Sequence, residues 1–294
     1  MLNKGNVIVI GGSGFMGSHT ADELSDRGYD VTIFDCVTSP WLREDQTMLL
    51  GDLLDRDQVV EATKDMDYLY HFAGIADIAE AKEKSFDTIN INVMGTTIAM
   101  EAAVKNNIKR FVYASTMYVY SPYGSFYRAS KQAAETIIEA YHEKYGIDYT
   151  LLRYGSLYGP RAQSWNGLRK YVSQVVKNGK LLYSGTGEER REYIHTEDAA
   201  RLSVDVLDDA HKNQAITVTG HQVLNSNELL NMIFEIAGKE QDVEFTSENL
   251  SGDHYIMTPY RYTPKRAKKL VPEEFVDIGQ GILEIVEDIN RESD

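Results

Sequence analysis

The sequence predicts an α/β protein, with a doubly wound parallel sheet and, after it, a smaller mixed α/β domain. The first observation is a run of β-branched residues at 7–10, typical of a strand buried on both faces. The second is the spacing of Gly11, Gly14 and Gly17 directly before a predicted helix over 18–27. The third is that apolar runs alternate with helical patterns up to residue 114. Five strands in that order imply parallel pairing with right-handed crossovers.

The glycine turn after the first strand predicts a pyrophosphate site. Gly11 lets the chain turn sharply, Gly14 lets the backbone approach phosphate, and Gly17 lets the helix pack on the strand. The N-terminus of the helix adds free N–H groups and the positive end of its dipole. This order is typical of a Rossmann-type dinucleotide site, although a tight turn without a ligand would also favour glycine.

The second strand, over 29–34, supports the dinucleotide interpretation because it ends at Asp35. An acid about twenty residues beyond the glycines can accept hydrogen bonds from the adenosine ribose diol. A carboxylate there repels the 2′-phosphate of NADP, and no arginine follows Asp35 directly, so NAD is favoured. Arg43 could still turn toward that phosphate, and the alternative role of Asp35 is that of a solvated turn acid.

The next two strand ends continue the predicted cofactor site. Asp52 closes a strand over 48–53 and could accept from the adenine amino group while Leu53 packs on the ring. Alternatively, Asp52 caps the helix predicted over 55–63. After the strand over 67–72, the small residues Ala73 and Gly74 would let a cofactor pass close to the backbone. His71, inside that strand, is predicted to be a core histidine. In a parallel sheet these strand ends share one edge, where ligands bind.

A tyrosine and a lysine on one helix predict the chemistry. Tyr127 opens a helix over 127–144, and Lys131, four residues later, shares its face. Tyrosine is a poor base with a pKa near about 10, but a neighbouring ammonium and the positive nicotinamide of NAD stabilise the tyrosinate. Thr116, after the fifth strand at 109–114, could share the hydrogen bond to the reacting oxygen. The three suit removal of a hydroxyl proton while hydride leaves carbon for NAD.

The chain contains 19 tyrosines, so the Tyr-x-x-x-Lys spacing could also be a surface coincidence. Tyr118, Tyr120 and Tyr123 are rivals for the base, but none has a lysine four residues on. The position of Tyr127 after a serine- and threonine-bearing strand of a dinucleotide fold favours the catalytic interpretation.

Composition excludes several partners. The formal net charge of −15 argues against a surface for nucleic acid or an anionic membrane, and means that an anionic substrate needs a local arginine or lysine. The single cysteine, Cys36, allows no internal disulfide and fits a reducing compartment. No apolar run is long enough to span a bilayer, and the first strand starts so early that it leaves no room for a signal peptide. A cytoplasmic protein is therefore predicted, and no metal site is expected.

We expect residues 1–160 to form the dinucleotide-binding domain, with 192–211 returning to it, and 161–294 to form mainly the substrate domain. Predicted elements there are helices over 165–178, 226–238 and 273–289 and strands over 180–183, 215–219 and 243–246. Arg190 and Arg191 could be a solvated edge, but an anion clamp is favoured because the guanidinium fork suits phosphate. A helix begins near 195–198, capped by Thr196 or Asp198.

The chain resembles the extended short-chain dehydrogenase/reductase family, the NAD-dependent epimerases and dehydratases of nucleotide sugars. The motifs that carry the resemblance are GGSGFMG (11–17), GDL (51–53), HFAG (71–74), NVMGT (92–96), YAST (113–116), VY (119–120), YRASK (127–131), LRY (152–154), YGPR (158–161) and REYIH (191–195).

The resemblance implies a set of site residues. It assigns catalysis to Thr116, Tyr127 and Lys131, and substrate binding to Ser156 and Arg191. It implies cofactor contacts for Gly11, Gly14, Phe15, Met16, Gly17, Asp35, Asp52, Leu53, Phe72, Ala73, Gly74, Asn92, Tyr127, Lys131, Tyr154 and Gly155. It also implies a homodimer through the helices over 90–105 and 126–144.

Departures from the family pattern narrow the reaction. The dehydratases have a pattern like Thr-Asp-Glu after the fifth strand, whereas this chain has Thr116, Met117 and Tyr118, so a 4,6-dehydratase is not expected. The segment before Tyr127 is short, and Ser156 stands where the family has an asparagine. Near the C-terminus the family's usual arginine and aspartate pair is not recognisable, and Arg261 and Lys265, within a basic stretch over 260–270, are the candidates for the nucleotide contacts.

The predicted function is therefore an NAD-dependent nucleotide-sugar epimerase acting through a transient 4-keto sugar. The alternative is a nucleotide-sugar keto-reductase or dehydrogenase with net NAD(P)(H) turnover. A non-catalytic dinucleotide sensor is a third possibility, against which the matched Tyr127, Lys131 and Thr116 argue. The sugar, the base and the direction of reaction stay open.

Overall fold

A computed structural model of the chain describes residues 4–220, 223–246, 254 and 256–259, all within one compact unit over 1–262. The predicted helix over 273–289, the basic stretch over 260–270 and the candidates Arg261 and Lys265 lie outside the described residues. Within the described part of the chain, no helix is both long and apolar enough to cross a membrane.

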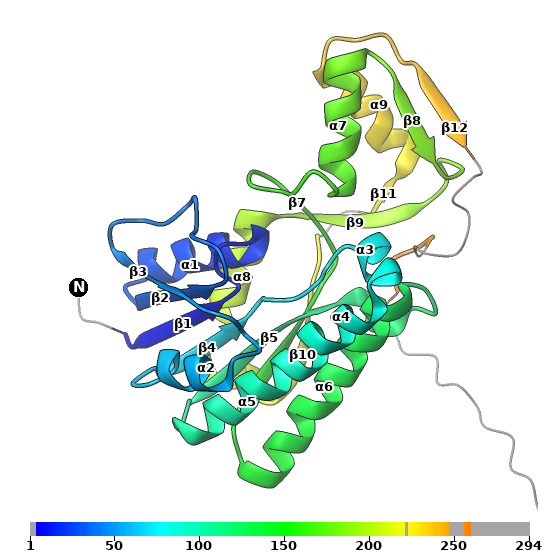
Figure 1. Cartoon of the computed structure of the whole chain (residues 1–294). Helices are drawn as coiled ribbons and strands as arrows, with labels where there is room; N and C mark the ends of the chain where they lie inside the picture. The colour runs from blue at the N-terminus through cyan, green and yellow to red at the C-terminus, as the bar shows by residue number, and fades with distance from the viewer. Residues whose placement is uncertain (1–3, 221–222, 247–253, 255, 260–294) are drawn as a thin grey trace, which may run out of the picture. The chain divides into compact units, whose positions relative to one another are not determined.

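A seven-stranded sheet in which every pairing is parallel forms the centre of the fold (Figure 1). Its order, β10-β6-β5-β4-β1-β2-β3, reverses direction at β1 and β4, which defines a topological switch point. The doubly wound Rossmann-type sheet is thereby confirmed. Besides the five predicted strands it contains β6 and β10, of which β10 corresponds to the strand that the sequence predicts over 215–219 in the substrate domain. The strands are β1 Asn6–Ile10, β2 Asp30–Asp35, β3 Gln46–Leu50, β4 Tyr68–His71, β5 Arg110–Thr116, β6 Tyr149–Tyr154 and β10 Gln214–Val218.

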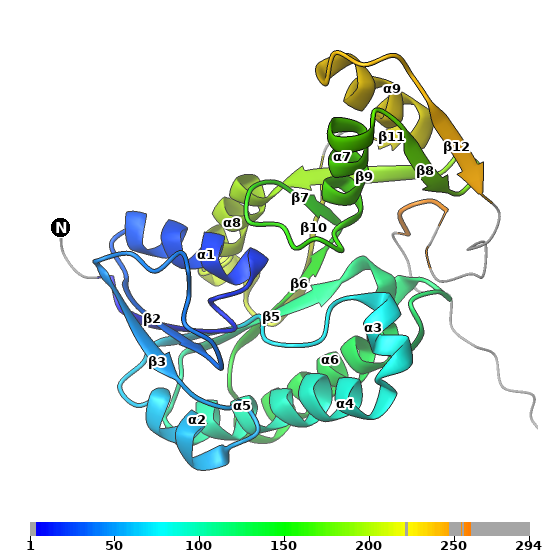
Figure 2. The ribbon, with the colours of Figure 1, turned by 45° about the horizontal axis from the view of Figure 1, so that its top comes forward.

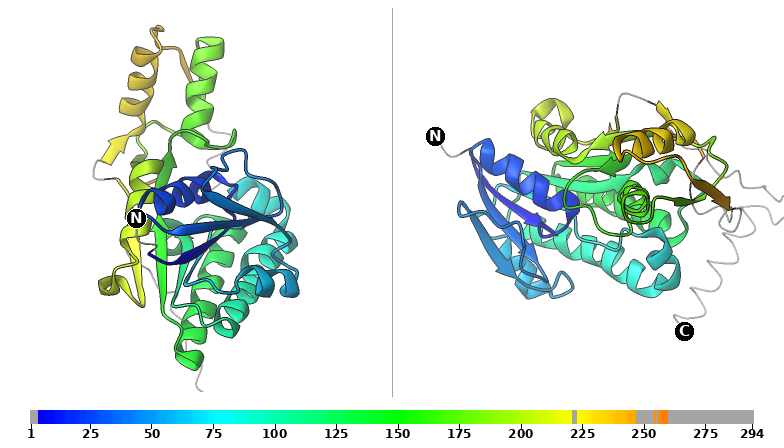
Figure 3. Two further views of the ribbon diagram at one scale, coloured as in Figure 1. Left: turned by 90° about the vertical axis from the view of Figure 1, so that its left-hand side faces the viewer. Right: turned by 90° about the horizontal axis from the view of Figure 1, so that it is seen from above.

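Helices cover both faces of this sheet (Figures 1 and 3). On one face α1 (Phe15–Asp26) packs beside α8 (Thr196–Asp205), and both contribute to a core with the buried Val7, Val9 and Leu152. On the other face α2 (Arg56–Ala62), α5 (Gly95–Lys105) and α6 (Ser125–Tyr145) cover a second core. The buried β-branched run of β1 contributes to both, as its composition predicts.

Three predicted boundaries differ in the structure. Helix α1 begins at Phe15, three residues before the predicted start, because Gly14 is its N-cap. The predicted helix over 90–105 is instead two consecutive elements, a π-helical turn (Asn90–Met94) and α5, and two further helices, α3 (Ile78–Glu83) and α4 (Ser85–Ile89), precede them. Thr116 belongs to β5 itself and does not follow it.

Two predicted helix caps are wrong. Asp55, and not Asp52, caps α2, because its side chain accepts from the N–H groups of Asp57 and Gln58. Helix α8 is capped by His195, whose side chain accepts from the N–H of Glu197, in place of the predicted Thr196 or Asp198. The propensity of aspartate and threonine for caps was a poor guide where a histidine stands in the required extended conformation.

The later part of the chain builds two small sheets beyond the carboxyl ends of the large one (Figure 2). One has the order β11-β9-β7 and the other the order β12-β8, and helices α7 and α9 cover a core of their own. Strand β10, after residue 211, pairs with β6 and so belongs to the large sheet. The elements are β7 Ser156–Tyr158, α7 Gly167–Asn178, β8 Leu181–Ser184, β9 Arg190–His195, β11 Val223–Asn225, α9 Ser226–Ile236 and β12 Val243–Thr246.

Candidate active site

A cavity of about 1710 Å³ opens at the carboxyl ends of the parallel strands. Its walls come from the ends of β1, β2, β4, β5 and β6, from α6 and from the smaller sheets. Every predicted site residue except Asn92 lines it. The volume exceeds the about 300–1,000 Å³ of an ordinary small-molecule pocket, so two ligands can share it.

The glycine turn forms one wall of the cavity and fits a pyrophosphate. Gly11 has a φ of +83°, and a Cβ there would lie 2.4 Å from the backbone nitrogen of Ala73. A Cβ on Gly17 would lie 2.2 Å from the carbonyl oxygen of Gly11, so only glycine allows α1 to start this close to β1. Gly14 has no side chain with which to cap α1, which leaves the first N–H groups of the helix to an anion.

Substitution of Gly11 by alanine should abolish retention of the cofactor. The added methyl must displace the backbone at Ala73, and the positive φ adds about 1–2 kcal/mol of strain. The matched control is Gly146→Ala, where φ is +73° and no atom lies within 4 Å, so only the strain applies. NAD titration by calorimetry distinguishes them, and equal NAD affinities in the two variants would contradict the assignment of the turn.

Asp35 is held by backbone groups at the end of β2. Its Oδ2 accepts from the N–H of Ser13 at 3.0 Å, and its Oδ1 from the N–H of Val37 at 3.3 Å. Arg43, the possible partner of a 2′-phosphate, is instead paired with Asp26 at 2.6 Å and Asp45 at 2.9 Å. The carboxylate therefore stands at the cavity without a cation from Arg43.

Asp35→Ser should lower NAD affinity about tenfold and weaken the discrimination against NADP, because a charged acceptor of the ribose hydroxyls and a repulsive charge are both removed. Asp30→Ser, at the exposed opposite end of the same strand, is the control and should change neither affinity. Fluorescence titrations with both nucleotides measure the ratio of the affinities for NAD and NADP. If this ratio is unchanged in Asp35→Ser, Asp35 is a solvated turn acid and not a ribose ligand.

Asn92 lies behind the cavity and does not line it. Its buried amide accepts from the N–H of Ile75 at 2.8 Å and donates to the carbonyl of Ile75 at 3.0 Å and to Ser130 Oγ at 2.9 Å. In the structure this amide joins the loop after β4 to α6, and its contact with the cofactor stays a prediction. His71 is a core histidine as predicted, since it is 1% exposed and burial lowers its pKa to about 3.

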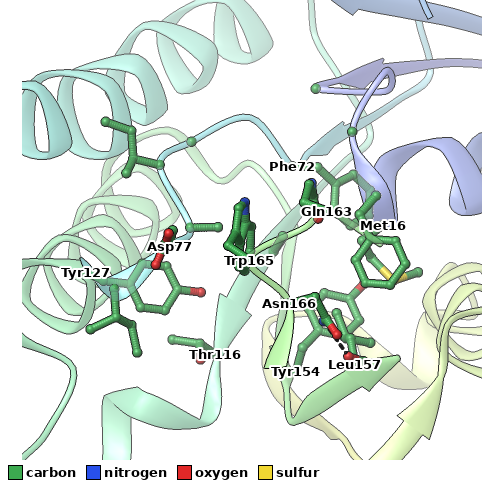
Figure 4. A pocket seen from close by; sticks show the side chains of 18 of the residues that line it. Met16, Phe72, Asp77, Thr116, Tyr127, Tyr154, Leu157, Gln163, Trp165 and Asn166 are labelled. Carbon is green, nitrogen blue, oxygen red and sulfur yellow. Dashed lines mark hydrogen bonds between the residues drawn. The ribbon is translucent and has the colours of Figure 1, made fainter. Parts of the chain in front are cut away.

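Thr116, Tyr127 and Lys131 are brought together by β5 and α6, and the Tyr127 and Thr116 side chains point into the cavity (Figure 4). The Nζ of Lys131 donates to the carbonyl of Ala114 at 2.7 Å and lies 5.9 Å from the ring centroid of Tyr127. Burial lowers the pKa of Lys131 to about 8, and the charge of Glu135 opposes this effect. The ammonium form therefore still dominates at neutral pH.

Several lining residues were not predicted. Tyr118, considered only as a rival base, packs edge-on against Tyr127 with ring centroids 6.1 Å apart, and its hydroxyl lies 2.6 Å from Nδ1 of His254. Trp165 comes from the segment before α7, where Asn166 donates to the carbonyl of Leu157 at 2.9 Å (Figure 4). The sequence has no motif that marks His254 or Trp165, because both reach the cavity only through tertiary structure.

Arg191 faces the cavity and Arg190 does not. The two are neighbours in β9, where successive side chains point to opposite faces, and Arg190 is exposed. Arg190 therefore lies at a solvent-exposed edge, Arg191 lines the cavity, and the anion clamp stays a prediction for Arg191. Ser156, at the start of β7, lines the same cavity.

The fold and the cavity define a dinucleotide-dependent enzyme with a Tyr–Lys pair. Comparison with known proteins is consistent with this class. The model of the NAD dependent epimerase/dehydratase family matches residues 7–219. A UDP-N-acetyl-alpha-D-glucosaminuronate decarboxylase of Bacillus cytotoxicus is 28% identical, over 73% of this chain and 75% of that protein.

Solved structures agree in fold. A UDP-N-acetylglucosamine 4-epimerase of Methanobrevibacter ruminantium, in complex with UDP-N-acetylmuramic acid, is 26% identical with a TM-score of 0.79, covering 89% of this chain and 91% of that chain. A UDP-glucose 4-epimerase of Thermus thermophilus, in complex with NAD, is 25% identical with a TM-score of 0.76, covering 88% and 90%. The chain belongs to the NAD dependent epimerase/dehydratase family, and its cofactor is NAD.

Proposed function

We propose that the protein is a nucleotide-sugar epimerase that acts through a transient 4-keto sugar. The observation that carries the proposal is the convergence of Thr116, Tyr127 and Lys131 on the cavity that the glycine turn also lines. NAD, when bound, supplies the acceptor and donor of hydride. Gly11, Gly14 and the first turn of α1 would bind its pyrophosphate, and Asp35 its adenosine ribose.

The proposed chemistry of the protein's own groups is proton transfer at the sugar 4-hydroxyl. Tyr127 takes the proton as the hydroxyl carbon is oxidised, and Thr116 donates a hydrogen bond to the reacting oxygen. The Lys131 ammonium favours the tyrosinate by its charge, and it would also hold the nicotinamide ribose. When the keto sugar has turned in the cavity and hydride returns to the other face, Tyr127 gives the proton back.

The proposal favours epimerisation over dehydration because of the two residues after Thr116. These are Met117 and Tyr118, and neither can supply the carboxylates expected of a 4,6-dehydratase. A cavity of about 1710 Å³ also leaves the keto sugar room to rotate. Epimerases, dehydratases and decarboxylases all occur among the similar proteins, so likeness alone does not choose among these reactions.

The proposed substrate is a nucleotide sugar, as in the complex of the Methanobrevibacter ruminantium relative. An anionic diphosphate must be met locally, since the formal net charge of the chain is −15. Arg191 and Ser156 line the cavity and would bind this group.

The test is to denature the purified protein and quantify the released nucleotide. Near-stoichiometric NAD supports an epimerase, because the cofactor is regenerated in every cycle and has no need to leave. Protein that is empty but binds added NAD(H) weakly would instead support the keto-reductase or dehydrogenase, with net consumption of the cofactor. Protein that binds neither nucleotide would refute the proposed site.

We also propose a homodimer through the helices over 85–105 and 125–145. The proposal is supported by apolar side chains that this monomer leaves exposed there, Phe86 at 80%, Met94 at 45% and Phe126 at 42%. Phe86→Glu should convert the dimer to a monomer in analytical ultracentrifugation. Phe245→Glu, at a 47% exposed position on β12, should leave it intact. A monomeric wild-type protein would contradict the proposal.

A further inference from the structure

A buried network lies directly behind the catalytic residues, and the proposed reaction does not use it. Glu135 stands on α6 four residues beyond Lys131, so Tyr127, Lys131 and Glu135 follow one face of the helix. Both Lys131 and Glu135 are buried, at 5% and 7% exposure. A carboxylate is rarely found at such depth unless it is paired.

Glu135 is paired with two strands at once. Ser115 Oγ, on β5, donates to Glu135 Oε1 at 2.5 Å. Arg153, on β6, donates through Nε to Oε1 at 3.0 Å and through Nη2 to Oε2 at 2.6 Å, a bidentate pair. Arg153 Nη1 also donates to the hydroxyl of Tyr120, and its guanidinium lies 4.7 Å from the centroid of that ring.

These contacts lie at the carboxyl ends of β5 and β6, next to residues that line the cavity. Ser115 is the register partner of Arg153, and the next pair in the ladder is Thr116 with Tyr154, both of which line the cavity. The carboxylate therefore fixes α6 against the strand ends that present Thr116 and Tyr154. Rotation or sliding of α6, which would move Tyr127 away from Thr116, must break at least two hydrogen bonds to a buried charge.

Among the charged and titratable groups around Lys131, Glu135 is the one whose charge acts on the pKa of this lysine. On α6 these are Tyr127 and Glu135, on β5 Tyr113, on β4 His71, and on β6 Arg153, which is bound to Glu135. Burial raises the pKa of Tyr113 and lowers that of His71, so both are neutral at working pH. The charge of Glu135 is what opposes the loss of the Lys131 proton on burial.

We propose that Glu135 is a positioning residue of the active site. Through Ser115 and Arg153 it holds the strand ends that carry Thr116 and Tyr154 against α6, and it places a negative charge on the helix face that carries Lys131. The inference rests on the proposed function, since it assigns Lys131 its part in proton transfer.

The test is the pH profile of kcat/KM of the NAD-loaded enzyme and three variants. Glu135→Gln keeps the shape of the side chain and removes its charge, and we expect the alkaline limb to shift down by about one pH unit. Glu135→Asp keeps the charge and should retain the wild-type limb. Arg153→Lys disturbs the same network but leaves the carboxylate, so it should lower kcat without moving the limb.

The inference would be overturned if the alkaline limb of Glu135→Gln stayed in place while kcat fell as in Arg153→Lys. Glu135 and Arg153 would then be a purely structural ion pair. Glu135→Gln leaves a buried arginine unpaired, which destabilises the fold. The double variant Glu135→Gln/Arg153→Met removes both charges together and replaces the single variant if that one does not fold. Because loss of the Arg153 cation opposes loss of the carboxylate, we expect a downward shift that is smaller than that of Glu135→Gln but in the same direction. The variant Tyr127→Phe distinguishes failure of the proposed function from failure of this inference. Full activity in Tyr127→Phe would refute the proposed function itself and not this inference alone.

Discussion

Tyr127→Phe should lower turnover of the nucleotide sugar by about 10²–10⁴-fold, the range of a lost general acid–base group. The ring and its contact with Tyr118 remain, so the fold and NAD retention should be unchanged. Steady-state kinetics by NMR or coupled assay measure the loss, and quantification of released NAD checks the site.

Tyr123→Phe is the matched control for this prediction. Tyr123 also lines the cavity and lies in the same short segment before α6, but no lysine follows it by four residues. Its hydroxyl should contribute less than about threefold to kcat, since a lost neutral hydrogen bond at a wet site is worth on the order of 0.5 kcal/mol. Full turnover in Tyr127→Phe, or a larger loss in Tyr123→Phe, would place the base elsewhere.

Lys131→Met should inactivate the enzyme and yet stabilise the fold of the NAD-free protein. A buried ammonium with a pKa lowered to about 8 destabilises the folded state relative to an unfolded lysine. Allowing for the lost hydrogen bond to the carbonyl of Ala114, we expect the free energy of unfolding at pH 7 to rise by about 1–2 kcal/mol. Denaturant titration measures it, and Lys144→Met, exposed near the end of the same helix, is the control.

The pH dependence of this gain has a defined sign. Below the folded pKa of about 8, both states of the wild-type protein bind the proton and the destabilisation is fully present. Above it, the folded state loses the proton first, so the unfolded state binds more protons and the wild type becomes more stable with rising pH. The advantage of Lys131→Met should therefore be largest below pH 8 and shrink toward the unfolded pKa. A gain that grows with pH would contradict a buried ammonium.

The site residues and the sheet were predicted from local sequence patterns. The glycine turn and Asp35 are short-range features whose spacing sets their geometry, and Tyr127 and Lys131 need only one helix. The structure places all of them around one cavity. The parallel sheet was predictable for the same reason, since buried strands have a recognisable composition.

The features that the sequence did not reveal depend on tertiary register. In the sequence Glu135 is an ordinary acidic residue of a helix. Only the structure shows that β5 and β6 bring Ser115 and Arg153 into contact with it. His254 is 136 residues from Tyr118 in the chain, and no pattern of either predicts their contact. Asn92 lies in a motif of the family, and only the structure shows that its side-chain amide is hydrogen-bonded to Ile75 and Ser130.

The central claim, reversible oxidation at C4 with return of the same hydride, is tested most directly by isotope. Incubation of the NAD-loaded enzyme with UDP-glucose deuterated at C4, followed by NMR, should give the C4 epimer with the label retained and no net formation of NADH. UDP-N-acetylglucosamine with the same label is the second substrate. Accumulation of NADH, or of a keto, dehydrated or decarboxylated product in place of the epimer, would contradict the account.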